Sequence, residues 1–150
     1  MNSLKFSVCL FVLLAAIECQ AQVFIDCDVE FYGGGSARAE GLFRQTPNGP
    51  RGSLNVQLTG FKFDSIRMES ITSLHYLGGT ALFEGPAVMT RGQGRFMKRI
   101  HGTLGGYVED IDASNPNFPD SMILIFETKT DVRLSVSGAL TSGEITVIDQ

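Results

Sequence analysis

Apolar and polar residues alternate along most of the chain after residue 21, and this period of two constrains the fold more than any other feature. In one clear stretch, Leu54, Val56 and Leu58 alternate with polar residues. Successive side chains of a strand point to opposite faces, so the pattern predicts strands with one buried face. No stretch shows the period of a long amphipathic helix, and Gly, Asn, Asp and Pro separate the runs. The chain is therefore expected to be all-β, an antiparallel sandwich or barrel-like domain of about eight short strands.

Several segments can be assigned individually within this pattern. Gly33–Ser36 and Gln45–Gly52 are rich in Gly and Pro and are predicted to be turns or loops. Arg95–Leu104 is predicted to be a strand that follows a turn. The run Met122–Phe126 is continuously apolar, which predicts a central strand buried on both faces.

The first 21 residues differ in composition from the rest. Met1–Lys5 carries one positive charge, Phe6–Ile17 is apolar apart from Ser7, and Cys19–Ala21 offers small residues at the positions that a signal peptidase reads. This is the order of a secretory signal peptide. Residues 1–21 are thus expected to be removed and residues 22–150 to form a single secreted β-domain. The apolar run is too short to span a bilayer as a helix, so no membrane span is expected.

Composition and cysteine usage narrow the function classes. The net charge of -4 argues against a nucleic-acid-binding protein, which needs a basic face, and 43% hydrophobic residues argue against disorder. Once residues 1–21 are removed, Cys27 is the one cysteine left. It cannot close an internal disulfide. If exposed, Cys27 is expected to form an intermolecular disulfide and a dimer; if the protein is monomeric, the thiol is expected to be buried near Phe24 and Val29.

The polar segment Asp110–Asp120 is a candidate calcium loop. Its opening D-x-D-x-S matches the first ligand positions of a calcium-binding loop, but the Gly and Glu that an EF-hand requires later are absent. A looser extracellular calcium site is one interpretation; the other is a solvated turn whose Asx side chains bond their own backbone. The candidate ligands are Asp110, Asp112, Asn117 and Asp120. No other cofactor is expected.

The one basic cluster of the chain lies between residues 91 and 101. It comprises Arg91, Arg95, Lys98, Arg99 and His101. On a strand beginning at Arg95, the side chains of Arg95, Met97, Arg99 and His101 would share one face. A basic stripe on a secreted protein suits a sulfated polysaccharide or an acidic protein partner. The alternative is an edge strand kept soluble by charge.

No reactive constellation is visible in the sequence. Ser36 follows Gly34, but Arg38 stands where a nucleophile elbow needs its second glycine. The two histidines, His75 and His101, lack the spacing or the Cys partners of a zinc site. The protein is therefore not expected to be an enzyme, and no catalytic residue is assigned.

Four segments between Gly34 and Val136 resemble one known family. They are GSARAEGLF (Gly35–Phe43), LTGFKFDSIRMESI (Leu58–Ile71), ALFEGPAVMTRGQGRF (Ala81–Phe96) and PDSMILIF (Pro119–Phe126). In strand order and texture they resemble the Gly-rich all-β domain of post-COAP type, found in secreted and surface proteins. The resemblance implies an extracellular β-domain without known catalytic residues.

These observations lead to one functional expectation with two alternatives. The chain is expected to be a secreted, non-enzymatic structural or binding module of the extracellular space or matrix. The first alternative is a calcium-dependent or mineral-associated matrix protein that uses the Asp110–Asp120 segment. The second is a small secreted enzyme or enzyme inhibitor.

Overall fold

The computed structural model describes residues 21–111 and 117–148, and within them the chain is all-β. The strands pair antiparallel in the order β4-β3-β2-β1-β9-β8-β7-β6, and β4 also pairs with β6, which closes an eight-stranded barrel. β5 is an additional strand that pairs with β6. The expectation of an all-β antiparallel fold is confirmed, in its barrel form. The elements are β1 (Gln22–Phe31), β2 (Ser36–Thr46), β3 (Gly49–Thr59), β4 (Ser65–Met68), β5 (Ser73–Leu77), β6 (Thr80–Arg91), the 3-10 helix η1 (Gly94–Phe96), β7 (Lys98–Glu109), β8 (Ser121–Glu127) and β9 (Val132–Ile148).

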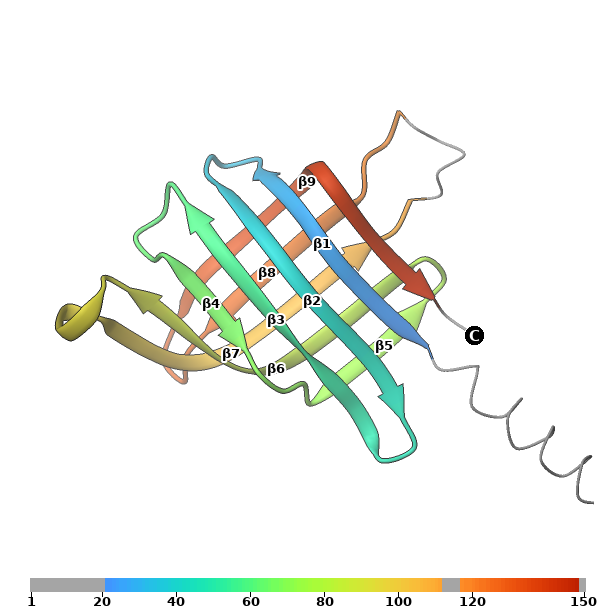
Figure 1. Cartoon of the computed structure of the whole chain (residues 1–150), viewed down its shortest axis with the longest axis horizontal. Coiled ribbons are helices and arrows are strands. Elements are labelled where there is room, and N and C mark those ends of the chain that lie inside the picture. The colour runs from blue at the N-terminus through green and yellow to red at the C-terminus, as the bar shows by residue number, and fades with distance from the viewer. Residues whose placement is uncertain (1–20, 112–116, 149–150) are drawn as a thin grey trace, which may run out of the picture.

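The barrel is flattened into two layers whose strands cross (Figure 1). β1, β2, β3 and β4 run along one diagonal of the view, and β6, β7 and β8 run along the other behind them. β9 joins the layers, because residues 132–139 pair with β8 whereas residues 138–148 pair with β1. The register shifts opposite Asp28 and Val29, at the bend of β9. Strands that switch layers commonly turn the corner at such irregularities.

Alternation along each strand fills the barrel with apolar side chains. Val23, Ile25, Cys27 and Val29 all point inward from β1, and Phe43 packs on Phe83 with ring centroids 4.7 Å apart. A side chain at Gly106 would place its Cβ 2.1 Å from the Phe83 ring, so this glycine makes room for the ring. Among the described residues, no polar or charged residue is fully buried. Chemistry directed at a partner therefore has to come from the outer surface or the loops.

Two segments differ from their sequence-based predictions. The run Met122–Phe126 is not buried on both faces, since Ile123 and Ile125 are 39% and 40% exposed. The strands of this barrel have one inner face, and no described helix covers the outer one. In Gln45–Gly52 the predicted turn is shorter than the segment, since β2 and β3 pair as far as Thr46 and Gly49 and leave only two residues in the turn.

Candidate functional site

The β6–β7 hairpin extends beyond the rest of the barrel (Figure 1). Its last paired residues are Arg91 and Lys98, and a six-residue connection containing η1 joins them. Gly92 and Gly94 have φ of 82° and 61°, a conformation that glycine adopts without strain. The Asp64 carboxylate accepts a 2.7 Å hydrogen bond from the Gly92 backbone N–H. This bond ties the base of the turn to the segment before β4.

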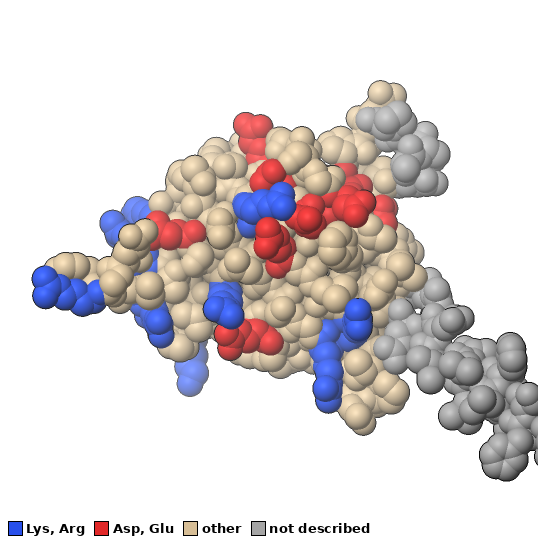
Figure 2. Space-filling view, viewed as in Figure 1, with Lys and Arg blue, Asp and Glu red and all other residues tan. Residues whose placement is uncertain are grey.

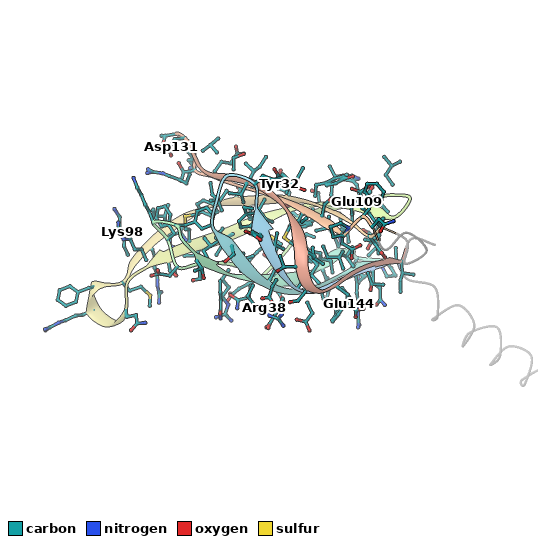
Figure 3. The ribbon with its side chains drawn as sticks, turned by 90° about the horizontal axis from the view of Figure 1, so that it is seen from above. Tyr32, Arg38, Lys98, Glu109, Asp131 and Glu144 are labelled. Carbon is teal, nitrogen blue, oxygen red and sulfur yellow. The ribbon has the colours of Figure 1, made fainter. Side chains whose placement is uncertain are left out.

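Cationic side chains gather on this hairpin. Arg91, Arg95, Lys98 and Arg99 are all exposed, and Lys98 lies toward the projecting end (Figure 3). Within the described residues, none of these four takes part in an ion pair. The Arg95 guanidinium lies 5.2 Å from the centre of the Phe96 ring, and Phe96 is 80% exposed. We call residues 91–99 the basic tip.

The structure corrects one detail of the predicted basic stripe. β7 begins at Lys98, and Arg95 belongs to η1, so Arg95 is not on the strand with Arg99 and His101. The physical reason is that the turn continues past Gly94: the backbone N–H groups of Phe96 and Met97 donate hydrogen bonds to the carbonyls of Gln93 and Gly94, which holds Arg95 in η1. The basic side chains therefore surround the end of a hairpin and do not form a flat stripe.

A groove of about 690 Å³ lies on the outer face behind the basic tip. Cross-strand register places Arg67 of β4 in one row with Val88 and His101. Ser65, Thr90 and Arg99 form the next row. Met97 also lines the groove. The lining of the groove is mixed, with two guanidinium groups, hydroxyls, apolar side chains and the Glu69 carboxylate. Guanidinium groups and hydroxyls can hold sulfate or carboxylate groups carried on a larger molecule.

Arg67 was missed by sequence reasoning. It lies 24 positions before Arg91 in the chain and reaches the groove because β4 pairs with β6. Its guanidinium is 3.2 Å from the Glu69 carboxylate, and both side chains are largely exposed. Nothing in the local pattern around Arg67 signals this pairing, since barrel closure is a long-range contact.

The opposite charge collects on another part of the surface. Asp26 of β1 lies in register between Glu40 of β2 and Glu144 of β9, and Asp28 lies beside Arg38 in the next row. The Arg38 guanidinium bonds Asp26 and lies 3.4 Å from both Asp28 and Glu40. Figure 2 shows acidic side chains gathered in the upper part of this face, and basic side chains at the projecting end and along the lower edge. The net charge of -4 thus conceals a separation of charge.

The acidic segment is partly tied into the barrel. The Asp110 carboxylate accepts a 3.0 Å bond from Val147 N–H. The two Asp120 oxygens accept bonds from Ile111 N–H and Ile145 N–H, at 2.9 and 3.1 Å. Asn117 is exposed, and Asp112 lies outside the described residues. In residues 21–111 and 117–148 no group of three or more His, Cys, Asp and Glu is placed to hold a metal ion. The calcium site stays a prediction.

Cys27 lies inside the barrel and is fully buried. Of the two residues expected near it, Val29 shares the interior face whereas Phe24 points to the outer one and is 38% exposed. Burial raises the pKa of the Cys27 thiol to about 12, with a smaller opposing effect of Arg38. In the folded barrel the thiol is therefore not available to link a second chain.

Because Cys27 is buried, its thiol is expected to react slowly with alkylating reagents in the native protein. Because alkylation requires the thiolate, native protein at pH 8 is expected to react with iodoacetamide only as fast as the barrel opens, and denatured protein within minutes. Between pH 9.0 and about 12, the Cys27 thiol ionises in the unfolded chain but stays protonated in the folded barrel. The free energy of unfolding is therefore expected to fall as the pH rises through this range. Rapid labelling of native protein, followed by mass spectrometry, would contradict the buried position.

Comparisons with known proteins add no family assignment. No protein-family model, curated protein or solved structure matches this chain. The described part of the chain also contains no helix long and apolar enough to cross a membrane.

Proposed function

We propose that the protein is a secreted, non-enzymatic binding module of the extracellular space or matrix, and that it holds a sulfated polysaccharide through the basic tip and the adjoining groove. The observation that carries the proposal is a cluster of four exposed cations on one hairpin, none of which has an ion-pair partner among the described residues. Arg44 and Arg51 on the β2–β3 hairpin are exposed and unpaired as well, but they are only two. Structural cations on a soluble surface are usually mixed with carboxylates. Residues 91–99 include no Asp or Glu, and the Asp64 carboxylate at the base of the tip accepts a hydrogen bond from the Gly92 N–H.

Three features support a sulfated polymer as the ligand. The cations stand on a projecting hairpin, so an extended chain can contact them from several sides. Arg91 and Lys98 face each other across the hairpin, and Arg99 continues the positive charge into the groove, where Arg67 is paired with Glu69. The hydroxyls of Ser65 and Thr90 also line the groove, and because they hydrogen-bond each other, one of their two protons is left to donate to a ligand oxygen.

Secretion is the second part of the proposal. It is supported by the basic start, apolar middle and small-residue end of residues 1–21. The first strand begins at Gln22, the residue that the predicted cleavage would leave at the new N-terminus. The resemblance to the post-COAP type of domain favours the same extracellular placement.

The role of the basic tip in polysaccharide binding can be tested by comparing two pairs of cations on different hairpins. Arg91 and Lys98 are cross-strand neighbours on the β6–β7 hairpin, and Arg44 and Arg51 are cross-strand neighbours on the β2–β3 hairpin. We expect the double variant Arg91→Gln/Lys98→Gln to bind a heparin-like sulfated oligosaccharide roughly tenfold more weakly, by isothermal titration calorimetry at low salt. The variant Arg44→Gln/Arg51→Gln carries the same net charge change and should bind like the wild type.

Equal losses in the two variants would show that net charge, and not the basic tip, governs binding. No measurable binding by the wild type at low salt would reject a polyanion as the ligand. Affinity should also fall as salt is raised, because exposed charges are screened.

A further inference from the structure

A second exposed surface lies on the outer face of β6, β7 and β8, away from the basic tip. Cross-strand register aligns Leu82, Tyr107 and Ile123 in one row, and Gly105 lies beside Ile125 in the next. Leu82, Ile123 and Ile125 are 45%, 39% and 40% exposed. Because Gly105 has no side chain, the surface is hollowed there, with a volume of about 350 Å³. We call this feature the outer hollow.

Carboxylates border the outer hollow. Glu84 shares the cross-strand row of Gly105 and also lines the hollow. Glu109 lies two residues from Tyr107 on the same face of β7, and Glu127 two residues from Ile125 on the same face of β8. Arg133, on the neighbouring strand β9, is already paired with Asp131 at 3.0 Å. The outer hollow therefore suits an occupant that is apolar at its centre and cationic around it.

The chain itself carries a group of this description. Phe96 is 80% exposed at the projecting end of the β6–β7 hairpin, next to Met97, which is 41% exposed. The Arg95 guanidinium lies against the Phe96 ring, and the exposed residues Arg91 and Lys98 form the last pair of the same hairpin. Aromatic, methionine and arginine side chains are enriched at protein interfaces. Its charge is opposite to that of the border of the outer hollow.

The basic tip cannot reach the outer hollow of its own molecule. Leu82 and Arg91 lie on the same strand, nine residues apart. A strand rises about 3.3 Å per residue, so roughly 30 Å of paired ribbon separates the two features. Contact between them requires a second molecule.

We propose that the basic tip of one molecule inserts Phe96 into the outer hollow of a second copy, so that copies associate head to tail. Such a contact joins two different surfaces and leaves one of each kind free at the ends, so it extends to chains of molecules unless the rotation closes a ring. Facing hollows in a symmetric dimer would instead bring Glu84, Glu109 and Glu127 of both copies together. The proposal does not depend on the polysaccharide ligand.

Two variants test the two surfaces separately. Phe96→Ala removes the inserted side chain, and Phe118→Ala is its control, since Phe118 is 61% exposed and belongs to neither surface. Gly105→Leu fills the outer hollow, and it is compatible with folding because a Cβ there meets only the Phe83 carbonyl, at 3.9 Å. Gly33→Leu is its control, because Gly33 has open space and lies in the β1–β2 turn.

Sedimentation velocity of the protein expressed from the full sequence, over a range of concentrations, gives the readout. The wild type and both controls should show masses that grow with concentration beyond the dimer, whereas Phe96→Ala and Gly105→Leu should each remain monomeric. Circular dichroism should show that all variants are folded. Gly105→Leu should keep the polysaccharide affinity of the wild type, since the basic tip is unchanged.

Mixing the two monomeric variants is the decisive step. In a head-to-tail contact, the tip of Gly105→Leu still fits the hollow of Phe96→Ala, so the mixture should form a 1:1 dimer that grows no further. A mixture that remains monomeric would overturn the proposal, because an intact tip and an intact hollow would then have failed to bind each other. A wild type that is monomeric at every concentration would overturn it as well.

Discussion

Replacing Phe43 by alanine is expected to lower the free energy of unfolding by about 3–5 kcal/mol. Phe43 is fully buried on β2 and packs on Phe83 of β6, so its ring connects the two layers of the barrel. Removing it leaves a cavity that neighbouring strands cannot fill, because each is held in register by its own hydrogen bonds. Urea unfolding followed by circular dichroism measures the loss.

Phe118→Ala is the matched control for this experiment. Phe118 is 61% exposed, and its truncation should change stability by no more than about 0.5 kcal/mol. A loss at Phe43 no larger than that at Phe118 would mean that the interior is not packed as described.

The substitution Gly143→Ala is expected to be equally damaging, with a loss of about 3–5 kcal/mol. Gly143 has φ +80° where β9 bends, and a Cβ there would lie 2.1 Å from the Asp26 carbonyl oxygen and 2.7 Å from the Cys27 Cα. Both contacts are with the backbone of β1, so the corner of the barrel would have to open. Thermal or urea unfolding of the variant gives the value.

The substitution Gly78→Ala is a control that measures the cost of a positive φ alone, without the steric clash expected at Gly143. Gly78 has φ +61°, but a Cβ there meets nothing within 4 Å. Gly78→Ala should therefore cost only the left-handed conformation, about 1–2 kcal/mol. Equal losses at Gly78 and Gly143 would show that the bend of β9 tolerates a side chain.

The alternation of single strands was enough to predict the fold class. Leu54, Val56 and Leu58 point inward from β3 as their spacing indicates, and the pair Gly78–Gly79 forms the turn between β5 and β6. The corner of β9 was not predictable, because Val132–Val136 and Ile145–Ile148 look like separate strands. They are one strand that changes partner midway, a consequence of long-range pairing.

The candidate site was predicted in part, for the same reason. The cluster Arg91, Arg95, Lys98 and Arg99 is local in sequence, and its exposure follows from its charge. Its shape depends on Gly94 and on the length of the hairpin, and Arg67 joins it only because β4 closes the barrel. The outer hollow could not be predicted for a different reason. Met122–Phe126 is apolar on both faces, which suggests that both are buried, but one of the two faces is exposed to solvent.

We propose that a sulfated polysaccharide binds at the basic tip and the groove behind it. The most direct measurement is a titration of isotope-labelled protein with a sulfated oligosaccharide, followed through backbone amide chemical shifts. We expect the shifts to be concentrated at residues 91–99, Arg67 and His101, and to be reversed by added salt. Shifts centred on the Arg44–Arg51 hairpin, or none at low salt, would contradict the account.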